Sequence, residues 1–244
     1  MRNKLYILFF FSLFTINHSL KAQFFFQAVG AYVAETSSRD GYRNLYSRDY
    51  NQDPLFLHTY PPSHRGGEYE SWGLGVFLEM LNNDMWKWRT EIEYANKGSR
   101  ETGGINPFFG YNQSGVNTSS RIQWNNYLKR YINLGLKYPT YALIGVRAEY
   151  SLTNSAPAYT LVAGKFNKLG ISGDAGLGME IPLRKGWSLF VEEHYNPDLM
   201  PKYSANKVIV WGRTWETRVG VIYRWKRGIG AYDIDCNAPR YHGR

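Results

Sequence analysis

Between residues 86 and 99 the chain alternates between uncharged and charged side chains. One set of alternate positions is mostly large and apolar: Trp86, Trp88, Thr90, Ile92 and Tyr94. The other set carries the charges: Lys87, Arg89, Glu91, Glu93 and Lys97. Successive side chains of a β-strand point to opposite faces, so this pattern predicts a strand with one apolar and one charged face. A strand of a soluble sandwich or lipocalin can look the same, and the rest of the chain must decide which face is buried.

The same alternation predicts about eight strands. They are expected at residues 24–35, 69–81, 86–99, 122–137, 141–152, 168–181, 187–195 and from 207 or 214 to 225. Long connections at 36–68, 100–120, 153–158 and 196–206 alternate with short turns at 82–84, 139–140 and 182–186. Outer-membrane barrels have long extracellular loops and short periplasmic turns, whereas a soluble sandwich has no reason to sort its connections by length. The sequence therefore predicts an all-β fold, a single eight-stranded antiparallel up-and-down transmembrane β-barrel.

The size of such a barrel decides which face is buried. Eight strands enclose a space only wide enough for side chains, so we expect the apolar face to meet lipid and the charged face to fill the lumen. The expected interior charge network is Lys87, Arg89, Glu91, Glu93, Arg147, Glu149, Asp174, Glu180, Glu216, Arg218 and Arg224, together with Glu79. Paired charges and interspersed glycines would close the lumen, so a wide diffusion pore is not expected. The expected lipid-facing aromatic girdle is Trp72, Trp86, Trp88, Tyr94, Tyr150, Trp187, Tyr223 and Trp225.

The N-terminal segment predicts export. Arg2 and Lys4 precede an apolar run at residues 5–14, and small side chains offer a cleavage point before Gln23, as in a secretory signal peptide. The apolar run is too short for a membrane-spanning helix, which needs about 20 residues. We therefore expect three segments: a signal peptide at 1–22, an outer-membrane barrel domain at 23–226 and a periplasmic tail at 227–244.

Charge and composition fit this location. The formal charge of +9 falls to +6 when cleavage removes Arg2, Lys4 and Lys21. The positive residues are interleaved with acidic ones, so attraction to outer-membrane lipid and lipopolysaccharide explains them better than nucleic acid. Aromatic residues make up 17% of the chain, which suits a protein with two membrane–water interfaces. The lone cysteine, Cys236, cannot form an internal disulfide.

Four short motifs resemble those of one barrel family. They are Glu91-Ile92-Glu93-Tyr94 followed by Lys97-Gly98-Ser99, Gly176-Leu177-Gly178-Met179-Glu180, His194-Tyr195-Asn196, and Gly220-Val221-Ile222-Tyr223-Arg224-Trp225. On these motifs the stretch from Glu70 to Trp225 resembles the PorT-like outer-membrane β-barrel family, which is similar in architecture to the OmpA and OmpX barrels. The resemblance implies fold and location rather than an activity. Two departures are a histidine at position 194, where the family usually has arginine, and a chain that continues beyond Trp225.

One histidine is a candidate catalytic residue. Lipid A deacylases, which are small barrels of this architecture, pair a histidine with a serine two residues later. Here His194 is followed by Tyr195 and Asn196, so that activated hydroxyl is absent from the motif. We therefore interpret His194 as a polar residue at the mouth of its strand and predict no catalytic residue.

Two further groups of residues are candidate binding sites. Possible metal ligands in the first long loop are Asp53, His58, His64 and Glu68, but their spacing fits no rigid ligand geometry. The glycines between 170 and 178 lack the strand-then-helix context of a nucleotide-binding loop. The sequence predicts no metal site and no cofactor.

The favoured function is a non-enzymatic outer-membrane barrel whose extracellular loops bind a partner. The first long loop is rich in aromatic side chains suited to contacting a protein: Tyr42, Tyr46, Tyr50, Phe56 and Tyr60. Adhesion, secretion and envelope integrity all fit, with an extracellular or secretion-machinery protein as partner and no nucleic acid. Two alternatives stay open: an outer-membrane lipid-modifying enzyme of the lipid A deacylase kind, and a soluble lipocalin-like carrier.

Overall fold

The computed structural model describes residues 26–44, 63–81, 85–101, 115–155, 165–204 and 208–225. The expected signal peptide, the tail with Cys236 and the central parts of the long connections lie outside these residues, so the predictions made for them stay predictions. Within the described residues, no helix is long and apolar enough to cross a membrane.

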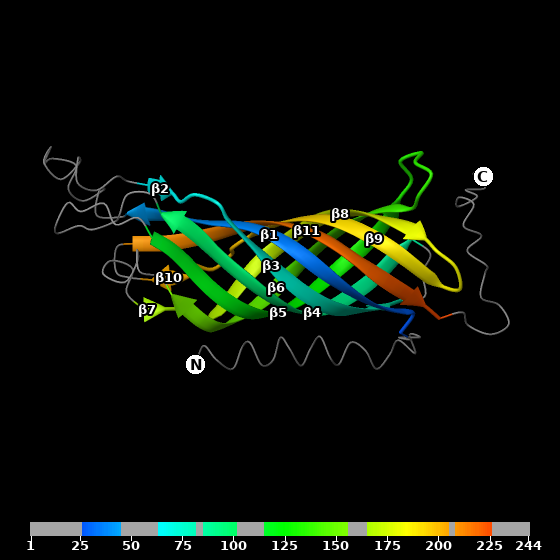
Figure 1. Cartoon of the computed structure of the whole chain (residues 1–244), viewed down its shortest axis with the longest axis horizontal. Helices are drawn as coiled ribbons and strands as arrows, with labels where there is room; N and C mark the ends of the chain where they lie inside the picture. The colour runs from blue at the N-terminus through cyan, green and yellow to red at the C-terminus, as the bar shows by residue number, and fades with distance from the viewer. Residues whose placement is uncertain are drawn as a thin grey trace, which may run out of the picture.

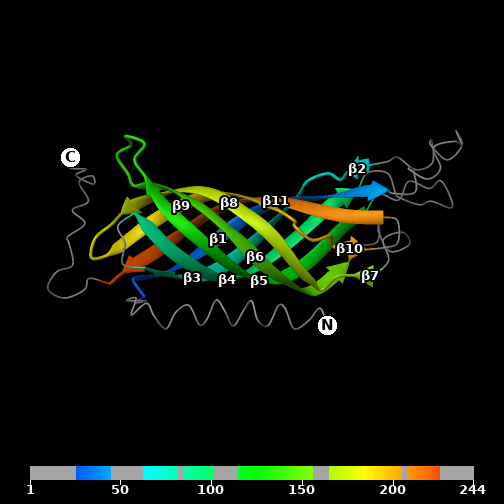
Figure 2. The same cartoon turned by 180° about the vertical axis from the view of Figure 1, so that it is seen from behind.

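Eight long antiparallel strands form one closed sheet (Figures 1 and 2). They are β1 (Ala28–Asn44), β3 (Tyr69–Met80), β4 (Trp86–Glu101), β5 (Gly115–Ile132), β6 (Thr140–Ser155), β8 (Leu169–Pro182), β9 (Trp187–Pro197) and β11 (Val208–Arg224). Three short strands join the sheet at the end with the long connections: β2 (Ser63–Arg65), β7 (Lys165–Phe166) and β10 (Tyr203–Ser204). We call this end the loop end and the opposite end the turn end.

The barrel closes where β1 pairs with β11, from Ala28 opposite Arg224 to Asn44 opposite Val208. Following the register partners once around the barrel from Met80 returns to Glu70 on the same strand, a stagger of ten residues. Such a stagger requires strands that are tilted against the barrel axis, as Figure 1 shows. The prediction of an all-β, eight-stranded antiparallel up-and-down barrel is confirmed.

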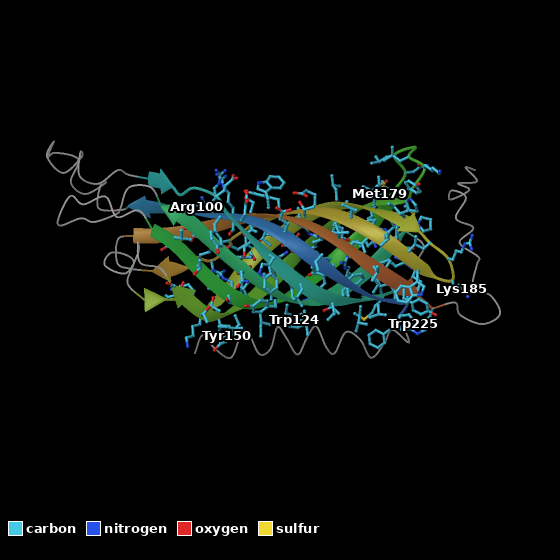
Figure 3. The ribbon with its side chains drawn as sticks, viewed as in Figure 1. Arg100, Trp124, Tyr150, Met179, Lys185 and Trp225 are labelled. Atoms are coloured by element: carbon cyan, nitrogen blue, oxygen red, sulfur yellow. The ribbon has the colours of Figure 1, made fainter. Side chains whose placement is uncertain are left out.

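The two faces of the sheet are inverted relative to a soluble protein. Ile92, Val146 and Val221 are 62%, 55% and 38% exposed, whereas Arg89 and Arg147 are 1% and 0% exposed. In Figure 3 the rings of Trp124 and Tyr150 project away from the barrel wall. A soluble lipocalin-like carrier would bury its apolar face and expose its charges, so that alternative is contradicted.

Strand boundaries at the loop end differ from the predictions. β1 runs to Asn44 instead of residue 35, whereas β11 begins at Val208, next to the earlier of its two predicted starts. β4 and β5 continue into the stretch predicted as a loop, where Glu101 pairs with Gly115. These extensions carry polar side chains on both faces, so hydrophobic alternation gave no sign of them.

At the turn end, β5 ends at Ile132 instead of residue 137, because its partner β6 begins opposite it at Thr140. Residues 133–139 therefore lie outside the sheet, and the connection there is longer than the predicted two-residue turn.

An aromatic cluster packs inside the lumen. Its members are Ala28, Tyr32, Ala34, Phe77, Phe190 and Ile222. The rings of Phe77 and Phe190 lie 5.5 Å apart at an angle of 73°, and the guanidinium carbon of Arg89 lies 3.6 Å from the Phe77 ring centroid. Aromatic faces attract cations, so this cluster supports the charged side chains that fill the rest of the lumen.

Candidate functional site

The middle of the lumen is occupied by a guanidinium that binds three carboxylates. Arg218 on β11 donates from Nη1 to Oε2 of Glu91 at 2.8 Å and from Nη2 to Oε2 of Glu93 at 2.9 Å. Its Nε donates to Oε1 of Glu216 at 2.6 Å. All four side chains are fully buried. A buried charge is tolerated only when it is paired and hydrogen-bonded, and this fork meets both conditions.

A second guanidinium extends the network across the barrel. Arg147 on β6 donates to Asp174 at 2.6 Å, to Glu216 at 3.0 Å and to the amide oxygen of Gln123 at 2.6 Å. Because Glu216 contacts both arginines, the side chains of β4, β6, β8 and β11 form one continuous cluster. The cluster links opposite walls of the barrel through the lumen instead of leaving an open channel.

Tyrosine hydroxyls bind carboxylate oxygens that the arginines also contact. The Tyr32 hydroxyl lies 3.0 Å from Oε2 of both Glu91 and Glu93, between which its one proton is shared. Tyr127 donates to Asp174 at 2.6 Å, and Tyr141 donates to Glu192 at 2.6 Å. Glu192 also pairs with Arg89. A phenol supplies a donor without adding positive charge, which suits a lumen rich in carboxylates.

His194 lies inside this network and is fully buried. Its Nδ1 is 2.7 Å from Oδ1 of Asp174, and its Nε2 is 3.2 Å from Oε2 of Glu192. Ionised carboxylates only accept hydrogen bonds, so this geometry suits the doubly protonated, positively charged ring. The prediction that His194 lies at the mouth of its strand is therefore wrong: the ring is part of the charge network.

A separate cluster closes the turn end. Lys129 on β5 contacts Glu79 at 2.7 Å and Glu180 at 2.6 Å. Arg224 contacts the same two carboxylates at 3.0 and 2.6 Å. The ammonium of Lys129 also lies 3.8 Å from the centroid of the Tyr141 ring. Two cations and two anions thus balance at this level of the lumen.

At the loop end, residues 198–204, which we call the strap, continue the barrel wall beyond the end of β9, between β8 and β11. Its backbone bridges two strands, because Leu199 N donates to Ile171 O at 2.8 Å and Lys202 N donates to Val210 O at 2.9 Å. The Lys202 ammonium hydrogen-bonds Asp40 on β1, and both side chains are buried. Two small hollows, each with room for about one water molecule, lie beside Lys202. Just below, Glu149 binds Lys97 and Arg121 at 2.8 and 2.5 Å.

The predicted interior residues lie on the lumen side, but Lys87 does not join the ion pairs described above. Its ammonium donates to the side-chain oxygen of Gln27 at 2.6 Å and to the carbonyl of Leu81 at 3.3 Å. Lys87 and Arg224 are half-buried, and the others are buried. Network members that the sequence analysis missed are Asp40, Lys97, Arg121, Lys129, Glu192, His194 and Lys202. For Arg121 and Lys129 the strand alternation was a usable signal, since they share parity with buried Gln123, Asn125 and Tyr127.

The predicted girdle residues all lie on the outward face. Trp72, Trp88, Tyr150, Trp187 and Trp225 are exposed, and Trp86, Tyr94 and Tyr223 are half-buried. Tyr94 and Tyr223 stack on neighbours: ring centroids are 5.8 Å apart for Trp72 and Tyr94, and 5.0 Å for Trp187 and Tyr223. Exposed tryptophans that were missed are Trp124, Trp211 and Trp215.

Among the described residues, no group of three or more His, Cys, Asp or Glu side chains is arranged to hold a metal ion. The candidate metal ligands Asp53 and His58 lie outside the described residues. Only the backbone of the candidate His64 is described, in β2. The described carboxylates of the lumen are already engaged with arginine, lysine, histidine or tyrosine.

No protein-family model matches the chain, and no curated protein is significantly similar to it in sequence. Solved structures with a similar chain trace include Neisserial surface protein A, with 11% identity, a TM-score of 0.42 and coverage of 80% of this chain and 97% of that one. The outer membrane protein OprG from Pseudomonas aeruginosa has 10% identity, a TM-score of 0.48 and coverage of 82% and 96%. Ail, the attachment invasion locus protein of Yersinia pestis, has 11% identity, a TM-score of 0.33 and coverage of 80% and 99% in its complex with the heparin analogue sucrose octasulfate. At these values no function or ligand is carried over from those proteins to this chain.

Proposed function

We propose that this chain is an outer-membrane β-barrel of a Gram-negative bacterium that presents binding loops outside the lipid, without forming a diffusion pore and without catalysing a reaction. The observation that carries the proposal is the change in the outward side chains along the strands, which is clearest on β4 and is interrupted by Asn126 on β5 and Glu193 on β9. They form an apolar band between two aromatic levels and become polar beyond the second level.

The apolar band has the height of a bilayer core. On β4 the outward aromatic residues Trp86 and Tyr94 bound a segment with Ile92 between them. Eight residues at about 3.3 Å each, on a strand tilted by about 40°, span about 20 Å along the barrel axis. Outer-membrane barrels carry an apolar band about 25 Å tall between aromatic girdles. Outward residues on five other strands are also apolar and exposed: Val33, Val76, Val146, Leu177 and Val219.

Beyond Tyr94 the strands continue as a polar rim. β4 extends to Glu101, and its outward residues Asn96 and Arg100 are polar. The Asn96 side-chain oxygen accepts a hydrogen bond from Ser120 on β5 at 2.8 Å. Seven further residues raise the end of β4 by about 18 Å. Such a rim would hold the loops clear of the lipid head groups, which supports partner binding as their role.

The filled lumen argues against solute diffusion. Ion pairs cross it at three levels, centred on Lys129, Arg218 and Glu149, and a further buried pair, Lys202–Asp40, lies at the loop end. Removing one partner of a buried pair costs about 3–5 kcal/mol, so opening a water-filled path through several pairs is unfavourable.

Lipid modification of the deacylase type has no support at His194. The ring is fully buried and engaged with Asp174 and Glu192, so it does not reach the lipid-facing surface. A role of the protein as a scaffold for its loops therefore fits the described residues better than a role as an enzyme.

We further propose that the chain is a member of the PorT-like family. Its proposed role is adhesion, secretion or envelope integrity. The family assignment is supported by the motifs around Glu91, Gly176, His194 and Gly220, and the loops supply the surface for a protein partner. Lipopolysaccharide is the expected neighbour of the loop end.

Two measurements test the proposal. The chain from the membrane fraction should resist carbonate extraction and migrate differently on a detergent gel before and after boiling, because a closed barrel stays folded in cold detergent. An unshifted band that carbonate extracts would contradict the location. An epitope inserted after residue 108 should be accessible to antibody on intact cells, whereas one inserted after Gly135 at the turn end should require permeabilisation. The reverse result would contradict the orientation.

A further inference from the structure

We propose that the outer surface of the turn end recognises anionic glycerophospholipids of the periplasmic leaflet. The inference rests on the proposed outer-membrane location and adds a ligand to it. The surface, which we call the basic collar, consists of Arg130, Lys137, Arg184 and Lys185 with the leucines Leu134, Leu136 and Leu183.

The exposed charges of the described turn end all have one sign. Arg130, Lys137, Arg184 and Lys185 are exposed, and all four are positive. The acidic residues described at this end, Glu79 and Glu180, are buried in the lumen and paired with Lys129 and Arg224. The outside therefore keeps four positive charges that the described acidic residues do not balance.

The first part of the collar is the connection between β5 and β6. It projects sideways from the barrel wall at the turn end (Figure 1). Leu134 and Leu136 are 62% and 59% exposed, and they follow directly after the outward residues Leu128 and Ile132 of β5. Gly135 has a φ of +69°, and its N–H donates to the Asn133 side chain at 2.9 Å, which fixes the turn. Exposed leucines next to the lipid-facing band are suited to the membrane interface and not to water.

The second part is the turn between β8 and β9. Leu183 is 49% exposed, and Arg184 and Lys185 follow it directly. Leu183 N donates to the carbonyl of Trp187 at 2.8 Å, which closes the turn, and Figure 3 shows Lys185 at the extreme turn end. Both connections thus place a leucine immediately before a cation, as Leu136-Lys137 and Leu183-Arg184.

The aromatic neighbours fix the depth of these cations. The Arg130 guanidinium lies 5.0 Å from the Trp86 ring, and the Lys137 ammonium lies 5.5 Å from the Tyr138 ring. Tryptophan and tyrosine favour the level of the lipid head groups, so the cations beside them meet phosphate while the leucines reach the acyl chains. Phospholipid is the chosen occupant because the collar is continuous with the lipid-facing band and complementary in charge to an anionic head group.

The test uses the full chain folded into vesicles. A Leu136→Cys, Cys236→Ser variant is labelled with an environment-sensitive fluorophore and placed in equimolar phosphatidylglycerol and phosphatidylcholine, with the acyl chains of one or the other lipid brominated. We expect blue-shifted emission, and stronger quenching by brominated phosphatidylglycerol than by brominated phosphatidylcholine. Adding Lys137→Glu, Arg184→Glu and Lys185→Glu should abolish the preference, since each cation near an anionic surface contributes up to about fivefold in local binding. Arg100→Glu, an exposed change at the loop end, should preserve it.

Three results would overturn the proposal. Equal quenching by the two brominated lipids would remove the charge recognition. Water-like emission that turns blue only after a periplasmic protein fraction is added would assign the collar to a protein. A labelled chain that gives no heat-modifiable form in either vesicle would instead contradict the membrane location on which the inference rests.

Discussion

The ring of Tyr32 on β1 lies directly over Gly75, its register partner on β3. A Cβ atom at Gly75 would lie 2.4 Å from Cζ of that ring, closer than any real contact. The same relationship, a lumen ring over the glycine opposite it, recurs in the pairs Phe77–Gly30, Tyr141–Gly178, His194–Gly176 and Phe190–Gly220. Glycine lets these rings lie flat against the barrel wall, which leaves the axis of the lumen to the arginine and glutamate side chains.

Gly75→Ala should destabilise the barrel. The new methyl group would push Tyr32 off the wall and away from Glu91 and Glu93, and overpacking of this kind costs about 1–3 kcal/mol. The midpoint of urea unfolding in lipid vesicles measures the loss. Gly170→Ala is the matched control, because its Cβ would lie 3.9 Å from the nearest heavy atom, and it should stay within about 0.5 kcal/mol of wild type. Equal losses for both variants would contradict this account.

Arg218→Met should destabilise the chain by about 3–5 kcal/mol, because Glu91, Glu93 and Glu216 would lose the guanidinium between them. The same urea series measures this, and adding Glu91→Gln and Glu93→Gln should recover part of the loss by removing the unpaired charges. The control is Arg39→Met. Arg39 lies 3.8 Å from Glu68 in an exposed pair, so its loss should cost at most about 1 kcal/mol. A loss of stability no larger than that of the control would show that the Arg218 guanidinium does not stabilise the lumen network.

The depth of the lipid band can be tested on a single strand. Val146 and Leu152 are both exposed and outward on β6, on opposite sides of Tyr150. Val146→Arg should cost about 2–4 kcal/mol, because it places a cation in the hydrocarbon, whereas Leu152→Arg should cost about 0–1 kcal/mol beyond the girdle. Equal costs would contradict the proposed position of the membrane.

The sequence predicted the fold well where the two faces of a strand meet different surroundings. On β4 and β6, lipid on one side and the lumen on the other impose opposite chemistry, so alternation revealed both the strands and their orientation. On β5 the outward face includes Asn126 and Arg130 and the inward face includes Tyr127, so the contrast is weak and Lys129 was missed.

The strand extensions at the loop end and the Asp40–Lys202 pair could not be predicted from alternation. The rim strands have water outside and polar partners inside, so their extensions resembled loops. The Asp40–Lys202 pair joins residues far apart in the sequence, and only the register of the closed barrel brings them together.

Lys202→Met should loosen the strap without unfolding the barrel. The change leaves Asp40 buried without its ammonium partner. Residues 198–204 would keep their backbone bonds, such as those from Lys202 N to Val210 O and from Asn167 N to Lys202 O at 2.9 Å, and the bond from Gly212 N to the Asp198 side chain. Local stability should fall by about 2–4 kcal/mol, seen as faster hydrogen exchange at the amides of Asn167 and residue 202, while amides of β4 keep their protection. Lys168→Met, an exposed change nearby, should leave exchange unaltered. Unchanged exchange in the Lys202 variant would mean that the remaining hydrogen bonds fix the strap and that the ion pair has no part in holding it.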